Sequence, residues 1–173
     1  DSEAWLPHVL WSFDHPFQFQ STVFPAVSII DLDEEKERVD ERKQLFLQIK
    51  LPSVGNRSQI VSNPFAARFA ADGKRVYLTL AGSEDLLVFD LSRSGKQNSN
   101  RHRRKKFQGG AKATQLLRHL PGQNPRDLLI DGDHILVHNV MGQDLTRLNS
   151  GGSGPFARVT VDLPHFAKLV ETD

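Results

Sequence analysis

One segment of this chain occurs twice, at residues 63–78 and again at residues 124–137. Each copy begins with Asn-Pro, continues as an apolar run, passes through Asp-Gly and ends in a second apolar run, and the second copy is slightly shorter before the Asp-Gly. Each copy therefore predicts a strand, a hairpin turn that favours positive φ, and a second strand. Self-similarity at a fixed period is typical of repeat architectures, in which each unit buries its apolar face against its neighbours.

Strand patterns extend each copy to four short strands. The strands expected for the first copy, and then for the second, are 65–70, 75–80, 86–91 and 113–120, and 126–130, 134–140, 145–149 and 156–163. An earlier segment resembles a unit without its first strand, because Ile29–Leu32 matches Val88–Leu91 at the third-strand position. Apolar residues then alternate from Leu45 to Leu51, which is the period of a half-buried strand. Four antiparallel strands joined by tight turns are typical of one β-propeller blade.

The predicted fold class is therefore all-β, with about three four-stranded antiparallel β-propeller blades. The expected blade bounds are 4–51, 65–120 and 126–163. Because a closed propeller has roughly 4–8 blades, these blades are expected to be part of a larger propeller.

The two ends of such an array are expected to be exposed edges. A strand at 4–10 or at 156–163 could then pair with a second chain through main-chain hydrogen bonds. The chain opens with Asp1-Ser2-Glu3, without an initiator Met or a signal peptide, so we expect a processed or excised piece. A charge-rich stretch at 33–43 is expected to be a solvated loop.

Composition excludes several kinds of chemistry within this segment. Cysteine is absent, so disulfides, thiolate metal sites, cysteine nucleophiles and covalent haem attachment are excluded here. The formal net charge is +1, so no global field recruits nucleic acid or a membrane surface. No apolar stretch approaches the roughly 18 residues of a membrane span. A specific nucleic-acid partner and a membrane span are therefore not expected.

The strongest local charge feature is a basic run in the low-complexity stretch 97–110, which is expected to be poorly ordered. Its cationic side chains form a candidate anion-binding patch: Arg101, Arg103, Arg104, Lys105 and Lys106. The alternative is a solvated insertion that keeps a long loop soluble. The near-zero net charge and the single neighbouring aromatic, Phe107, favour this alternative.

No catalytic, cofactor-binding or metal-binding residue is assigned from the sequence. His134 and His138 share one face of an expected strand, but strand geometry separates them by roughly 13 Å, too far for one ion. His8 and His15 flank a loop, and Asp131, Asp133 and Asp144 are expected to satisfy local donors in turns. The Gly-rich run 151–154 is interpreted as a turn because it precedes a strand. Trp5 and Trp11 could line a sugar- or peptide-binding face, but aromatic residues in blades more often pack between them.

Residues 63–91 carry Asn-Pro, an apolar strand, Asp-Gly-Lys-Arg-Val-Tyr, Gly-Ser and a strand ending in Phe-Asp-Leu. This pattern resembles the YVTN-type repeat of bacterial β-propellers, and residues 124–149 match it in part. The resemblance covers about two thirds of the chain. It implies the propeller architecture and says little about activity, because propellers carry unrelated functions.

A narrower resemblance involves Ala4-Trp5-Leu6-Pro7 and the segment from Ser21-Thr22-Val23 to Ser28–Leu32. These residues look like the propeller that precedes a di-haem cytochrome c or c-type peroxidase module in some secreted bacterial proteins. That resemblance implies a periplasmic or extracellular location and a c-type haem elsewhere in the parent protein. The Cys-x-x-Cys-His haem motif is absent from this chain, so any redox chemistry would belong to a part outside it.

Two functional hypotheses follow. The first is a non-catalytic binding or scaffold module, whose partner is a protein or a neighbouring domain and which needs no cofactor of its own. The second is the propeller portion of a secreted c-type haem-dependent oxidoreductase. A haem motif encoded downstream in the parent gene would favour the second hypothesis, whereas further blades alone would favour the first.

Overall fold

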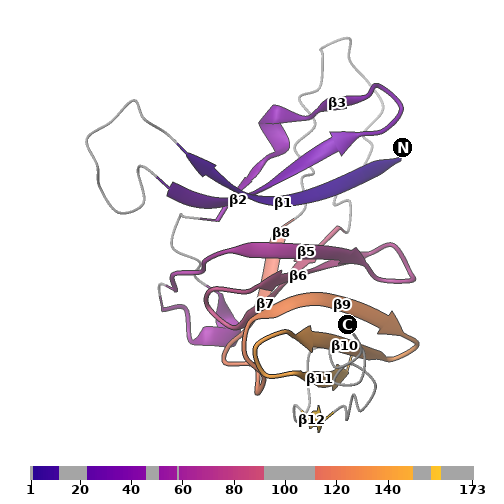
Figure 1. Ribbon diagram of the computed structural model, residues 1–173. Coiled ribbons are helices and arrows are strands. Elements are labelled where there is room, and N and C mark those ends of the chain that lie inside the picture. The colour runs from indigo at the N-terminus through magenta and orange to yellow at the C-terminus, as the bar shows by residue number, and fades with distance from the viewer. Residues whose placement is uncertain are drawn as a thin grey trace, which may run out of the picture.

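In a computed structural model, the protein forms antiparallel sheets and two short 3₁₀ helices across the residues that the structure describes (Figure 1). The described residues are 2–11, 23–45, 51–57, 59–91, 112–149 and 157–160. They contain three sheets of four strands each. The predicted all-β fold class is confirmed.

Each sheet is built from strands that are consecutive in the chain. The first sheet contains β1 (Glu3–Trp11), β2 (Val23–Asp31), β3 (Lys36–Glu37) and β4 (Lys43–Gln44), with the 3₁₀ helix η1 (Val39–Glu41) between β3 and β4. The second sheet follows the helix η2 (Pro52–Val54) and contains β5 (Pro64–Phe69), β6 (Arg75–Leu80), β7 (Asp85–Asp90) and β8 (Lys112–Leu117). The third sheet contains β9 (Pro125–Asp131), β10 (His134–Asn139), β11 (Asp144–Asn149) and β12 (Ala157–Thr160).

The two copies of the repeated segment make the same backbone contacts. Asn63 and Asn124, each followed by proline, have φ of 50° and 58°, a conformation that Asn tolerates better than most residues. Their carbonyl groups accept hydrogen bonds from the N–H groups of Ala81 (2.8 Å) and Val140 (3.1 Å). The start of the first strand of each copy is thereby tied to the turn that follows the second strand of that copy.

The first sheet matches the later ones from its second strand onward. Trp5 pairs with Ile29 as Tyr77 pairs with Val88, so β1 and β2 occupy the positions of β6 and β7. No described strand occupies the first position of this sheet. Both β3 and β4 pair with β2: β3 lies opposite Asp31 and its neighbour, and β4 lies opposite Ala26 and its neighbour. Together they form a divided outer strand.

The expectation of a solvated loop at 33–43 was wrong in part. This stretch contains β3, η1 and the start of β4. The reason is that its charges are matched: Arg38 pairs with Asp31, and Arg42 pairs with Glu37. Paired side chains can lie against a sheet at lower desolvation cost than unpaired ones. The strand expected from Leu45 to Leu51 falls mainly on 46–50, outside the described residues.

The sheets stack face to face, with β5 between β1 and β9 (Figure 1). Buried apolar side chains fill the space between the first and second sheets: Trp5, Val27, Ile29, Leu45, Leu51, Val61, Val76, Leu78, Leu80, Leu87, Phe89 and Leu116. A second cluster fills the space between the second and third sheets: Tyr77, Leu86, Val88, Leu117, Leu120, Leu128, Ile135, Val137 and Leu148. The second sheet therefore buries both of its faces. No helix in the described part of the chain is long and apolar enough to cross a membrane.

Candidate functional site

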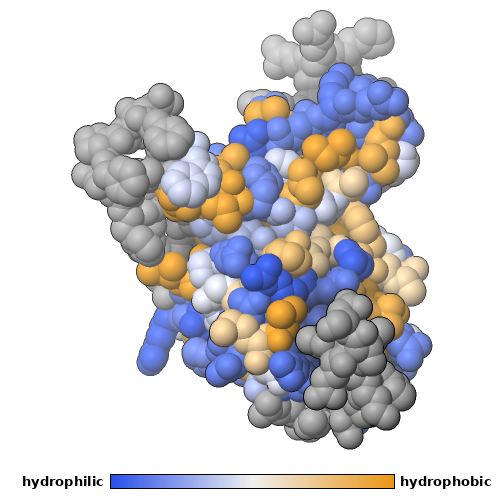
Figure 2. Space-filling view, in the orientation of Figure 1, coloured by the Kyte–Doolittle hydropathy of each residue, from blue (hydrophilic) through white to orange (hydrophobic). Residues whose placement is uncertain are grey.

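The first strands of the second and third sheets, β5 and β9, are called the inner strands here, and they carry two pairs of side chains in contact: Phe65 with Arg126, and Arg68 with Asp127. We call these four residues, together with Leu129, the inner-strand surface. In Figure 2, drawn in the orientation of Figure 1, hydrophilic and hydrophobic side chains are intermixed over β5 and β9. Phe65 remains 46% exposed although its strand belongs to the middle one of the three sheets, and Leu129 on β9 is 61% exposed.

Phe65 and Arg126 occupy equivalent positions in the two repeats. Each follows the proline that begins its strand, and Pro64 and Pro125 pair with Leu80 and Asn139, the last residues of β6 and β10. Because equivalent residues of adjacent inner strands become neighbours when the sheets stack, the arginine lies over the phenylalanine. The guanidinium carbon of Arg126 is 4.5 Å from the centre of the Phe65 ring, within the range of a cation–π interaction.

A second contact holds the arginine in place. Arg126 donates a hydrogen bond from Nε to Oδ1 of Asn124 at 2.7 Å. The ring of Phe65 restrains the plane of the guanidinium, and Asn124 restrains its rotation within that plane. The side chain is therefore oriented before any ligand arrives, which lowers the entropy lost on binding.

Arg68 and Asp127 form the second pair between the inner strands. Arg68 Nη2 lies 2.7 Å from Asp127 Oδ1, and the same oxygen accepts a hydrogen bond from the Leu128 N–H at 2.8 Å. Both side chains are about half exposed, at 50% and 56%, so the pair contributes little to stability. Its main effect is on the charge of the surface, because the Asp127 carboxylate neutralises Arg68.

A buried carboxylate begins the third strand of the second sheet. Asp85 is fully buried, and its Oδ1 accepts a hydrogen bond from the N–H of His119 at 3.2 Å. Arg118 Nη1 lies 3.3 Å from its Oδ2, an ion-pair distance without hydrogen-bond geometry. Burial raises the pKa of Asp85, and the hydrogen bonds and Arg118 oppose that rise. This carboxylate ties the segment after β8 to the start of β7.

The equivalent position of the third sheet, Asp144, belongs to a different buried contact. Asn139 donates from Nδ2 to Asp144 Oδ1 and to the hydroxyl of Thr146, both at 2.8 Å. Gly122, in the segment between β8 and β9, packs so closely that a Cβ there would lie 1.9 Å from Asn139 Nδ2. These contacts fix the connection between two sheets, and the buried Oδ1 of Asn139 has no hydrogen-bond partner among the described residues.

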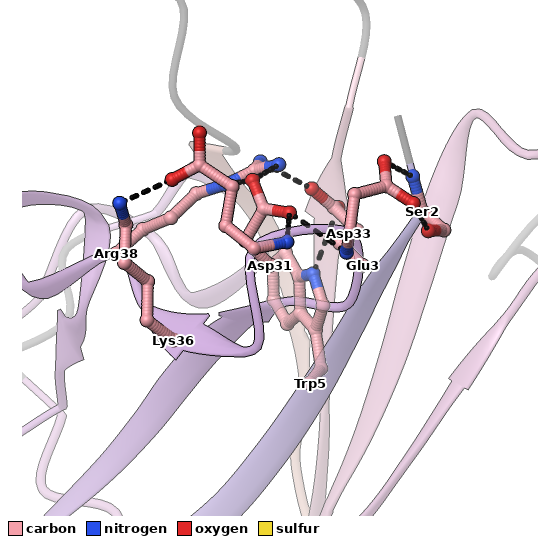
Figure 3. A network of polar contacts seen from close by, with 8 residues as sticks. Ser2, Glu3, Trp5, Asp31, Asp33, Lys36 and Arg38 are labelled. Carbon is pink, nitrogen blue, oxygen red and sulfur yellow. Dashed lines mark hydrogen bonds and ion pairs between the residues drawn. The ribbon is translucent and has the colours of Figure 1, made fainter.

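Figure 3 shows a polar network at the edge of the first sheet. Arg38 donates from Nη2 and Nε to Asp31, at 2.7 and 3.1 Å, and from Nη1 to Glu3 at 3.0 Å. Glu3 also accepts a hydrogen bond from the Trp5 indole. The hydrogen bond from Arg38 is the main reason that the pKa of Asp31 is lowered. This network joins β1, β2 and the residue after β3.

A serine, a histidine and a glutamate also meet on the first sheet, and this combination suggests a catalytic triad. His8 Nε2 is 2.8 Å from the hydroxyl of Ser28, and Ser28 is hydrogen-bonded to Glu37. Arg42 contacts both carboxylate oxygens of Glu37, at 2.7 and 2.6 Å, and lowers its pKa to about 2.

The direction of these hydrogen bonds argues against a triad. An ionised Glu37 only accepts, so the single hydroxyl proton of Ser28 is donated to Glu37. His8 must then donate from Nε2 to Ser28. In a triad the histidine accepts the serine proton, and the carboxylate lies on the other ring nitrogen. This arrangement therefore holds β1, β2 and β3 together without activating Ser28.

The residues singled out in the sequence are spread over the molecule or lie outside its described part. The basic run 101–106, His15 and the glycines at 151–154 all lie outside the described residues. His134 and His138 are exposed on β10, and in the strand register they lie opposite Asp131 and Asp127 of β9. In the described ranges, no group of three or more His, Asp or Glu side chains could hold a metal ion.

The two tryptophans differ. Trp5 is buried, and its ring meets Phe89 edge-on at 5.1 Å, so it packs between the sheets. Trp11 is 61% exposed at the end of β1. Asp131 and Asp133 are exposed near the β9–β10 turn, whereas Asp144 is buried.

Sequence reasoning missed the inner-strand surface. A signal was present, because the repeated segments differ sharply at one equivalent position, where Phe65 is replaced by Arg126. Equivalent positions of neighbouring repeats meet in a stacked array, so an aromatic in one copy and an arginine in the next predict a contact.

No family model matches this chain, and no curated protein matches it. Among solved structures, the chain is similar to Kuenenia stuttgartiensis hydrazine synthase, with a TM-score of 0.59 and 14% identity over 87% of this chain and 43% of that chain. It is also similar to PpgL, the periplasmic gluconolactonase of Pseudomonas aeruginosa, with a TM-score of 0.51 and 16% identity over 90% of this chain and 40% of that chain. At such identities the likeness shows the fold alone. The chain has the fold of β-propeller blades, and it spans less than half the length of either of these two structures.

Proposed function

We propose that this chain contributes blades of the YVTN repeat type to a larger β-propeller that acts as a non-catalytic binding or scaffold module. The inner-strand surface is the proposed binding surface, and its partner is a protein or a neighbouring domain. The observation that carries the proposal is the oriented pair of Phe65 and Arg126, which remains accessible between two blades. Exposed aromatic and arginine side chains are enriched where proteins bind one another.

The described polar clusters support binding over catalysis. Ser28, the one hydroxyl held by both a histidine and a carboxylate in the described residues, already donates its proton to Glu37. Asp85 and Asn139 form hydrogen bonds that fix the connections between blades. The alternative function, the propeller portion of a secreted c-type haem oxidoreductase, rests on the resemblance at residues 4–7 and 21–32. A periplasmic or extracellular location rests on the same resemblance.

A photo-reactive amino acid tests the proposed surface in the full-length parent protein, in the cells that produce it. Placed at Leu129, on the inner-strand surface, it should give a discrete cross-linked product with a partner or with another domain. Placed at Val39, which is equally exposed on η1, it should give none. The product should weaken when Phe65 is replaced by alanine. Equal products from both sites, or none from Leu129, would contradict the proposal.

A further inference from the structure

We infer that Arg126 binds a carboxylate group carried by an acidic peptide segment of the partner, with Phe65 contacting an apolar side chain beside that carboxylate. This inference rests on the proposed function, because it names the chemistry recognised by the same surface.

The first argument is the set of hydrogen-bond donors that Arg126 retains. A guanidinium has five N–H donors. Asn124 takes the one on Nε, and Phe65 covers a face of the group without using a donor. Within the described ranges, Nη1 and Nη2 contact no hydrogen-bond or ion-pair acceptor. The two terminal nitrogens therefore present the edge that binds a carboxylate through parallel hydrogen bonds.

The second argument is charge. The acidic residue next along β9, Asp127, already pairs with Arg68 and accepts the Leu128 N–H. Asn124, the partner of Nε, is neutral. Among the described residues, Arg126 thus has no ion-pair partner, while its position is fixed by a ring and an amide. An anionic group from another molecule would supply the missing charge.

The third argument distinguishes a carboxylate on a peptide from a phosphate. Sites for phosphate commonly gather several cations or backbone N–H groups. Here Arg68, the other described arginine of the inner-strand surface, is neutralised by Asp127. Phe65, which is 46% exposed, adds apolar area beside the guanidinium. A single planar cation beside an exposed aromatic ring suits an acidic residue that has an apolar neighbour.

The test compares two fluorescent peptides, acetyl-Leu-Phe-Glu-Phe-Leu-amide and the same peptide with Gln in place of Glu, by fluorescence polarisation against the full chain. The Glu peptide should bind about tenfold more tightly or better, because a hydrogen bond to a charged group is worth roughly that factor. In Arg126→Gln the two peptides should bind equally. Arg147→Gln, which removes an exposed arginine from β11, should keep the preference.

Other outcomes separate the two proposals. Equal affinities of the Glu and Gln peptides for the unaltered chain would overturn the carboxylate site, and this result needs no variant to fold. If inorganic phosphate displaced the Glu peptide at concentrations where acetate did not, phosphate would be the ligand and the inference would be wrong. If the cross-link at Leu129 survived in Arg126→Gln at full strength, the binding surface would stand while the carboxylate site would fail.

Discussion

The first sheet and the two later sheets stack in the same array, yet different interactions hold them together. The edge of the first sheet is tied by ion pairs, with Arg38 on Asp31 and Glu3, and Arg42 on Glu37. The later sheets are tied by buried polar side chains, Asp85 and Asn139, that lie against the connecting segment between them.

The pKa values of the carboxylates in these two regions are shifted in opposite directions. Hydrogen bonds from Arg38 and Arg42 lower the pKa of Asp31 and Glu37, whereas burial raises the pKa of Asp85. The first sheet thus depends on charged carboxylates. The second sheet accommodates a carboxylate that burial makes easier to protonate. The difference shows that one repeat fold can be secured by unrelated chemistry in successive units.

The largest effects should come from the apolar layers that both regions share. Leu78 faces the first sheet and Ile135 faces the second, and neither is exposed. Leu78→Ala and Ile135→Ala should each lower the free energy of unfolding by about 3–5 kcal/mol. Hydrogen exchange should show where protection is lost: mainly in β1 and β2 for Leu78→Ala, and in β9 and β10 for Ile135→Ala. Equal losses throughout the chain would mean that the sheets do not behave as separate units.

Gly122→Ala tests the buried contact of the later sheets. The added Cβ would meet Asn139 Nδ2, so Asn139 must move and lose its bonds to Asp144 and Thr146. Overpacking and the lost hydrogen bonds together should cost about 3 kcal/mol, measured by urea denaturation. Gly132→Ala is the matched control, because Gly132 has open space around it but a φ of 55°. That control should lose only about 1–2 kcal/mol; an equal loss in both variants would argue against the steric explanation.

Glu37→Gln tests the ion-paired region through pH. The pKa of Glu37 falls from an ordinary value of 4.5 to about 2 in the folded protein. Its contribution is therefore fully present above about pH 4.5 and is lost as the pH falls toward 2. The variant should show a flatter decline in Tm across this window, whereas Glu35→Gln, at an exposed turn position, should follow the unaltered chain. A decline as steep as that of the unaltered chain would assign the acid sensitivity to other groups.

The smallest effect should come from the exposed pair between the inner strands. A double-mutant cycle of Arg68→Ala and Asp127→Ala should give a coupling energy of about 0.2–1 kcal/mol, falling further at high salt. A coupling above about 2 kcal/mol would mean that the pair acts as a structural clamp between the blades, and the surface would then be less available to a partner.

Local sequence signals were enough to predict the strands of the later sheets. The strand expected at 75–80 coincides with β6, and the one expected at 134–140 differs from β10 by one residue. Asp-Gly and Asn-Pro act within a few residues, so their structural effect is visible in the sequence itself.

The division of the outer strand of the first sheet into β3 and β4 could not be predicted in this way. It depends on Arg38 and Arg42 finding carboxylates that the charge run alone does not identify. The inner-strand surface was missed for a related reason, since Phe65 and Arg126 are brought together only when two sheets stack.

Phe65 and Arg126 also have a consequence for how such a chain can evolve. When a gene segment encoding one blade is duplicated in tandem, the residue at this position first meets an identical copy of itself. Two arginines there would bring like charges together, and two phenylalanines would leave an apolar patch without a polar group to give it specificity. The effect of a mutation in one copy therefore depends on the residue that it contacts in the other copy. Divergence between the repeats at this position turns a contact between identical residues into a contact between an aromatic ring and a cation.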